Sequence, residues 1–208
     1  MTSTLSVAIG GLIAALLAAV PSAQERVSLK DLAREQGGKI RMILTVCGPA
    51  APMDFMASQA DLIVQGRILS TEPRLNDDET AVLTHVTITP SRIFKNTIAA
   101  GTALKPGPTP PIVILEPGGT VYVDGLEISY HSDSTPKPPL EVGEEVIAFL
   151  IRKPGTDLFW LYNGSYGVLR LRNGHVSAAS EEVAKYRPLE RTELAEVQQL
   201  IARLVQSH

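Results

Sequence analysis

Short stretches in which apolar and polar residues alternate follow one another from Ala60 to about Val176. Ala60–Ile68 opens the run, and the next stretch alternates in the same way, with one row formed by Val82, Thr84, Val86 and Ile88. Alternation with period two is typical of strands that bury one face. The chain has 15 prolines and 16 glycines, and they stand mostly between the apolar stretches, where they indicate turns. This pattern predicts a mainly β protein.

The turn residues divide this region into a series of short strands. We expect one sheet made of strands at 62–69, 81–94, 112–115, 120–123, 126–130, 146–151, 158–162 and 167–171, followed by 175–176. Asp124-Gly125 and Asn173-Gly174 are dipeptides that favour tight turns. Pro90 cannot donate to a ladder, so the second strand is expected to bend, to bulge or to lie at an edge there.

Helical spacing appears only before and after the strands. Ser28 and Asp31 resemble a capping box for a short helix, which a strand over 40–46 and a second helix over 52–59 follow. After Pro188, Thr192 is a candidate N-cap for a longer helix whose apolar stripe is Leu194, Val197, Leu200, Ile201 and Leu204. Many short strands and one packed terminal helix favour a small barrel, closed or partly open, over a large sandwich.

The first residues indicate export. Leu5–Val20 is apolar and uncharged, and Pro21-Ser22-Ala23 follows it as a small-residue cleavage site. We therefore expect residues 1–23 to be a signal peptide and the protein to be extracytoplasmic, either periplasmic or secreted. The alternative is a retained anchor, which is the only route by which we expect contact with a membrane. A helix of this length spans about 24 Å, less than the ~30 Å hydrocarbon core.

The mature chain then divides into an N-terminal extension (24–46), a barrel domain (47–178) and a C-terminal helical segment (179–208) packed on the barrel. Cys47 is the only cysteine, so the domain has no internal disulfide. Its two interpretations are a small buried apolar residue and a thiol that pairs with a partner.

The start of the barrel carries a resemblance to a known family. Cys47-Gly48-Pro49, the helix around Met53–Ser58 and the strand Ala60–Ile68 follow one another as in the netrin-like and tissue-inhibitor-of-metalloproteinases domains. The later strand Gly143–Leu150 resembles the Gly- and Glu-led strand of the same barrels. The chain is also similar to exported bacterial proteins of unknown function built on this oligonucleotide/oligosaccharide-binding (OB) barrel. The resemblance covers about residues 47–176 and implies an OB-like barrel.

The metalloproteinase inhibitors of that family bind zinc through a free N-terminal cysteine that disulfides hold in place. Cys47 lies well inside the chain and has no cysteine partner. This departure argues against the same zinc chelation, and a protease-inhibitor-like protein stays only as an alternative.

No catalytic or metal-binding set can be assembled from the sequence. The four histidines, His85, His131, His175 and His208, have no pair at metal-ligand spacing, and the polar segment 76–79 lacks the spacing of a calcium loop. Ser134-Thr135-Pro136-Lys137 has the Ser-x-x-Lys pattern but no helix to carry it. We therefore expect no enzyme, metal or cofactor; the alternative is a hydrolase that uses His131 and Asp133 near a serine.

Aromatic residues supply the remaining candidate site. The net charge of −3, with both signs interspersed, argues against nucleic acid as a partner. Five aromatic residues are candidates for a binding face beside the proline-rich loop 132–140, namely Tyr122, Tyr130, Trp160, Tyr162 and Tyr166. The alternative is that they belong to the core beneath the terminal helix. We expect an exported, non-catalytic interaction module for a protein, peptide or carbohydrate.

Overall fold

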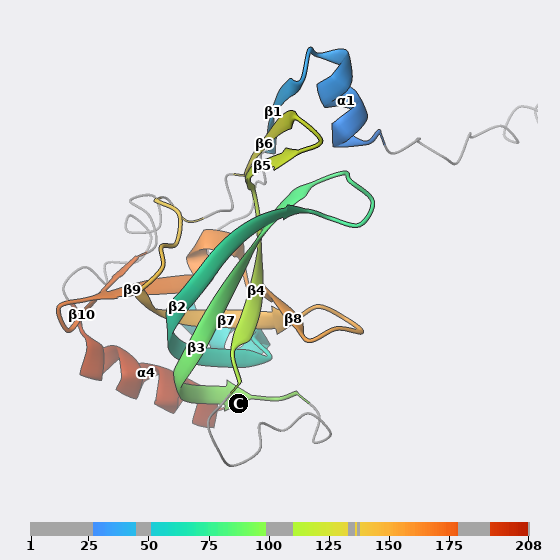
Figure 1. The fold of residues 1–208 in the computed structure, drawn as a ribbon. Coiled ribbons are helices and arrows are strands. Elements are labelled where there is room, and N and C mark those ends of the chain that lie inside the picture. Colours follow the sequence, from blue (N-terminus) through green and yellow to red (C-terminus); the bar gives the residue numbers. More distant parts are fainter. Residues whose placement is uncertain are drawn as a thin grey trace, which may run out of the picture.

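The computed structural model describes residues 27–44, 51–98, 110–132, 136, 138–178 and 192–207 of the 208-residue chain. Within these ranges the protein is mainly β with three α-helices, which confirms the predicted class (Figure 1). The predicted signal peptide and Cys47 lie outside the described residues. No helix in the described part of the chain has the length and apolar character needed to cross a bilayer.

Five strands close into a ring. They are β2 (Leu62–Leu75), β3 (Val82–Asn96), β4 (Ile112–Pro117), β7 (Glu145–Arg152) and β8 (Leu158–Leu161). The pairing runs β7-β2-β3-β4-β8, and β8 then pairs with β7 again. All these pairs are antiparallel except β4–β8, which is parallel.

A second arm of the same sheet leaves the ring at β7. The edge of β7 opposite β2 is shared, since residues 145–148 pair with β9 (Val168–Arg172) and residues 150–152 pair with β8. A 3-10 turn, η1 (Gly164–Gly167), precedes β9. The arm continues through β10 (His175–Ala178) to β11 (Thr192–Glu193).

The ring bends sharply where Gly66 of β2 faces Pro90 of β3. Register shifts between β2 and β3 follow Ile63, Gln65 and Ile68, as expected of bulges that increase the curvature of a sheet. A Cβ atom at Gly66 would lie 2.5 Å from Ile88 Cγ2 and 2.5 Å from the Thr89 carbonyl oxygen. Only glycine fits this close approach, and of the three alternatives expected at Pro90 the structure shows a bulge.

The inside of the ring is filled by the inward rows of its strands. Each strand contributes alternate residues to one buried cluster, for example Leu62 and Val64 of β2 and Val86 and Ile88 of β3. Phe159 and Leu161 of β8 join this cluster, while Trp160 between them is only partly buried. Successive residues of β8 therefore alternate between the inside and the outside of the ring.

Two helices cover the outer face of the sheet. α2 (Met53–Gln59) and α4 (Leu194–Gln206) pack against the outward residues of β7 and β9, where Phe149 and Leu169 are fully buried. Val197 and Ile201 of the predicted stripe lie in this interface, so the packed terminal helix is confirmed. The expected cap is wrong: Thr192 pairs with Val176 in β11, and Glu193 is the N-cap without a side-chain bond.

A separate three-stranded sheet lies beyond one end of the ring, with α1 against it (Figure 1). The tight turn at Asp124-Gly125 joins β5 (Gly119–Val123) to β6 (Leu126–Ser132), as predicted, and both turn residues have positive φ. The expectation that this hairpin belongs to the main sheet is wrong. Its edge pairs in parallel with β1 (Lys39–Leu44), and α1 (Leu29–Glu35) covers one face through Leu29 and Ala33.

α1 is also held by the tip of the β2–β3 hairpin. Ser28 caps α1 by accepting from the Lys30 amide at 3.2 Å, and its hydroxyl donates to Glu79 Oε2 at 2.9 Å. Lys30 Nζ lies 2.7 Å from Glu79 Oε1. Asp31 pairs with Arg34 and completes no capping box. The polar turn 76–79 therefore has a structural role, connecting ring and small sheet.

Candidate binding site

The inward rows of two ring-side strands end in charged residues. Glu116 of β4 follows Ile112 and Ile114 in the inward row, and it is only 3% exposed. Arg170 of β9 follows the inward residue Val168 and is also 3% exposed. Because alternate residues of a strand share a face, both side chains lie at the end of the ring that is nearest the small sheet.

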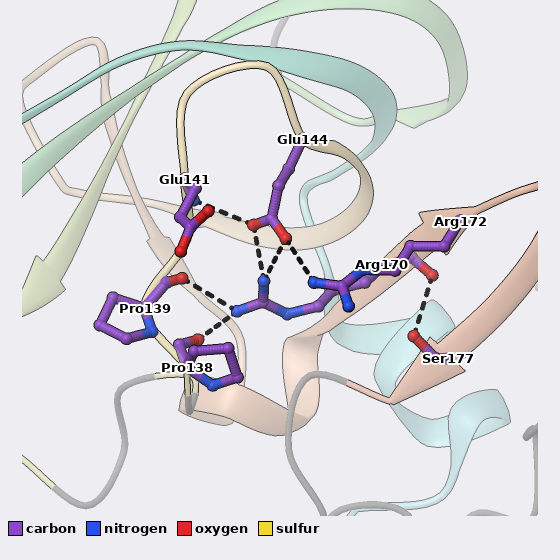
Figure 2. Close-up of polar contacts among 7 residues, drawn as sticks. All are labelled: Pro138, Pro139, Glu141, Glu144, Arg170, Arg172 and Ser177. Carbon is purple, nitrogen blue, oxygen red and sulfur yellow. Dashed lines mark hydrogen bonds and ion pairs between the residues drawn. The ribbon is translucent and has the colours of Figure 1, made fainter.

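Arg170 is the centre of a polar cluster, which Figure 2 shows. Its Nη1 donates to both carboxylate oxygens of Glu144, at 2.5 and 2.6 Å. Its Nη2 donates to the carbonyl oxygens of Pro138 and of Pro139, the latter at 3.2 Å. Nη2 thus holds the proline segment, which we define as Pro136 and residues 138–140, against β9. The Nε atom of Arg170 is buried and has no hydrogen-bond partner within the described residues.

Glu144 completes this cluster. One of its oxygens accepts from Arg172 Nη2 at 3.1 Å, and the other accepts from the Glu141 amide at 2.9 Å. Burial favours the neutral form, but the Glu141 amide and the guanidinium groups of Arg172 and Arg170 outweigh it and hold the pKa of Glu144 below its ordinary value. Glu144 is therefore ionised at neutral pH and balances the charge of Arg170.

Glu116 has no such compensation. Its Oε1 is buried and finds no hydrogen-bond partner in the described part of the structure. Burial raises the pKa of Glu116 to about 7, and the positive charge of Arg170 opposes this only partly. The group therefore changes its protonation near neutral pH, which is unusual for a carboxyl and typical of functional sites.

A cavity of about 360 Å³ lies beside Glu116, and we call it the mouth pocket. The ring supplies one side through Thr71, Pro73, Thr84 and Glu116. The small sheet supplies another through Thr120, Tyr130, His131 and Ser132, and the proline segment closes it with Pro136, Pro139 and Leu140. Pro139, whose carbonyl Arg170 holds, connects the polar cluster to the pocket wall.

A tight crossing from β4 to β5 brings the small sheet close to the ring. Gly119 has φ +127°, and a Cβ atom there would lie 2.7 Å from Pro73 Cβ and 2.8 Å from Thr84 Oγ1. The Thr84 hydroxyl donates to the Gly118 carbonyl at 2.6 Å. The glycine pair therefore shapes the wall of the mouth pocket between the two sheets.

The structure separates the five predicted binding aromatics. Tyr122 and Tyr130 lie on the small sheet, where Tyr122 is 78% exposed and Tyr130 is 9% exposed; their positions in the β5–β6 register place them on opposite faces. Trp160, Tyr162 and Tyr166 lie in or after β8 and are partly buried.

Of the five, Tyr130 alone lines the mouth pocket. Tyr162 packs on α2, with its ring centroid 6.4 Å from that of Phe55. The five residues thus form no common platform, and a binding role for the Trp160–Tyr166 group stays a prediction.

Residues of the proline-rich loop 132–140 contribute to the mouth pocket. Ser132, Pro136, Pro139 and Leu140 line the mouth pocket, and His131 precedes them in the same wall. Asp133 and the serine and lysine of the Ser-x-x-Lys pattern lie outside the described residues. No group of three or more His, Cys, Asp or Glu side chains in the described ranges has the arrangement of a metal site.

Glu116 and Arg170 were not among the residues predicted from the sequence. A signal for both is present in the chain: each is a charged residue two positions after an apolar residue of its strand, at a position where alternation requires an inward side chain. A buried charge at such a position indicates a paired or functional group. Reading the inward rows for charge would have found both.

The comparisons leave the family of this chain open. No family model matches it, and no curated protein matches it. The resemblance to the netrin-like and metalloproteinase-inhibitor domains therefore stays a prediction, based on the motifs of residues 47–68 and 143–150.

Proposed function

We propose that this protein is an extracytoplasmic, non-catalytic binding module that holds a small ligand, or one residue of a peptide or carbohydrate partner, in the mouth pocket. One observation carries the proposal. Glu116 lines an open cavity of about 360 Å³, and its buried carboxyl has an Oε1 with no hydrogen-bond partner among the described residues. A buried polar atom without a partner costs about 1–3 kcal/mol, and a ligand that supplies the missing hydrogen bond removes this cost.

The architecture supports an OB-like barrel as the framework of the module. The ring β7-β2-β3-β4-β8 has five strands. α2 directly precedes β2 in the chain, and α4 covers the outer face of the sheet. Barrels of this kind bind ligands on an open face flanked by loops. Here the proline segment and the small sheet flank one open end, at the mouth pocket.

Residue-resolved NMR tests the binding proposal. The purified protein is titrated with a set of small fragments that includes neutral sugars, amides, carboxylates and amines. We expect at least one fragment class to shift the amide signals of Thr71, Thr84 and Thr120 together, because these residues surround the cavity. A set in which no fragment moves these signals would overturn the proposal.

Export is tested separately from binding. The apolar segment Leu5–Val20 supports it. On expression of the full chain in a bacterial host, we expect the protein in the extracytoplasmic fraction with Gln24 as its first residue. Cytoplasmic protein that retains residues 1–23 would contradict export.

The mouth pocket also gives the hydrolase alternative a specific basis. His131 and Ser132 are neighbours in β6, and both line the cavity. If the protein is such a hydrolase, it cleaves p-nitrophenyl acetate, and Ser132→Ala and His131→Ala each abolish the cleavage. A turnover equal to that of buffer removes this alternative.

A further inference from the structure

The charged groups described around Glu116 balance one another and leave the negative charge of an ionised Glu116 uncompensated. Glu144 occupies one terminal nitrogen of Arg170, and the carbonyls of Pro138 and Pro139 occupy the other. Arg170 and Glu144 therefore balance each other, and an ionised Glu116 adds one uncompensated negative charge to this buried group. Arg172, which also contacts Glu144, is mostly exposed and is screened by solvent.

The described part of the pocket wall supplies no positive charge to Glu116. Among the described lining residues there is no lysine or arginine. Tyr130 contributes a neutral hydroxyl, since burial raises the pKa of its phenol above the ordinary value. The exposed His131 is the remaining titratable group in the wall. A ligand that carries its own cation would thus complete the charge balance of the site.

The rest of the wall is suited to a short aliphatic chain. Pro73, Pro136, Pro139 and Leu140 are apolar, and they line the cavity together with Thr71 and Thr84. Apolar walls with one charged acceptor orient a ligand whose charge is at one end of an apolar body. An anionic ligand would instead place its charge against Glu116, at a cost in a buried site.

We infer that the mouth pocket recognises a protonated primary amine on a short aliphatic chain, with the carboxylate of Glu116 as its partner. This inference rests on the proposed function and names its ligand class. Two sources supply the same chemistry, namely a free alkylamine and the side chain of a lysine in a peptide.

Amine binding and the protonation of Glu116 are coupled. The groups that face Glu116 are Arg170 from β9, with its partner Glu144, and Tyr130 and His131 from β6. Since the pKa of Glu116 is about 7, the carboxyl is ionised at pH 8 and mostly neutral at pH 5.5. An ammonium stabilises only the ionised form, so the bound amine lowers the pKa of Glu116 and releases its proton to solvent. Between pH 8 and pH 5.5, the affinity for the amine falls about 30-fold.

The experiment uses three probes of equal chain length: n-butylamine, n-butanol and sodium butyrate. Each is titrated into the purified protein at pH 8, and amide shifts of the pocket residues give its affinity. We expect n-butylamine to bind at least 10-fold more tightly than n-butanol or butyrate. In a carbon-detected pH titration, we expect saturating n-butylamine to lower the midpoint of the Glu116 carboxyl signal by one pH unit or more.

Two variants separate recognition from structure. Glu116→Gln keeps the shape of the side chain but cannot pair with a cation, so it should lose the preference for n-butylamine and its pH dependence. Glu72→Gln is the matched control, because Glu72 lies between the lining residues Thr71 and Pro73, is exposed and pairs with Arg74. This variant should bind n-butylamine like the wild type.

A peptide pair distinguishes the two sources. If the peptide acetyl-Gly-Lys-Gly-amide binds more tightly than n-butylamine, while its norleucine analogue does not, the natural source is a lysine side chain. If n-butanol or butyrate shifts the amide signals of the pocket residues, while n-butylamine and the lysine peptide leave them unchanged, the amine inference is overturned and the binding function stands. If no probe and no fragment of the wider set shifts them, both are overturned.

Discussion

The substitution Glu116→Gln should change how the free energy of unfolding depends on pH, even without a ligand. The carboxyl titrates near pH 7 in the folded protein, against 4.5 for an unburied glutamate. Because the folded state binds this proton more tightly than the unfolded state, Glu116 contributes fully to stability below about pH 4.5. The contribution declines as pH rises from there through 7, and it is lost above that pH.

The size of this loss follows from the difference between the two pKa values. A shift of one pKa unit corresponds to 1.36 kcal/mol, so the free energy of unfolding of the wild type loses about 3 kcal/mol between pH 4 and pH 9 through this group. The amide side chain of the variant has no proton to lose in this range. The free energy of unfolding of the variant, minus that of the wild type, should therefore rise by about 3 kcal/mol over the same interval.

Urea denaturation followed by circular dichroism, at intervals of one pH unit, measures this difference. The comparison uses the change of the difference with pH, so a constant penalty from burying an amide at position 116 cancels. Glu144 and the other carboxyls titrate equally in both proteins and cancel as well. Two stability curves that stay parallel from pH 4 to pH 9 would refute the assignment of a raised pKa to Glu116.

Three further substitutions test the framework of the site. Gly66→Ala should lower the free energy of unfolding by about 1–3 kcal/mol because its methyl group overlaps Ile88; an unchanged urea midpoint would contradict the close approach. Arg170→Met leaves the partly buried charge of Glu144 with only the Glu141 amide and the exposed Arg172 as partners, and it should cost about 1–3 kcal/mol at pH 7; the penalty shrinks as pH falls and Glu144 becomes protonated, and a loss independent of pH would count against the ion pair. Ile201→Ala opens a cavity between α4 and the sheet and should cost about 2–5 kcal/mol in the same assay; a cost below about 1 kcal/mol would show that α4 is not firmly packed.

Local patterns predicted most of the elements of this fold. The alternation of Val82–Ile88, the turn at Asp124-Gly125 and the stripe of Val197 and Ile201 all depend on neighbouring residues, and the structure confirms each of them. β2 extends to Leu75, beyond the predicted end at 69, because a bulge after Ile68 lets the strand continue past the bend.

Pairings between distant strands were not predictable in this way. The parallel contact of β1 with β6 joins residues 88 positions apart (Lys39 and Glu127), and nothing near either strand indicates the other. For this reason the hairpin of residues 119–132 was expected in the main sheet. The mouth pocket forms between the ring and the small sheet, so it depends on where this hairpin lies. From the sequence, only the proximity of Tyr130 to the proline-rich loop 132–140 could therefore be predicted.

The parallel pairing of β1 with β6 has a consequence for the order of folding. The β5–β6 hairpin closes locally, through Val123 and Leu126, and such hairpins form within about 1–10 μs. β1 can pair only after the chain between residues 44 and 119 has been brought together, because closing so long a loop in one step costs considerable entropy.

Formation of the ring shortens that loop beforehand. In the folded protein, Glu79 at the β2–β3 tip lies next to α1, and its carbonyl accepts from the Leu29 amide at 2.8 Å. We therefore expect residues 27–44, although they are synthesised before the ring, to dock after it. In hydrogen exchange, their amides should open at a lower free energy than those of β2 and β7.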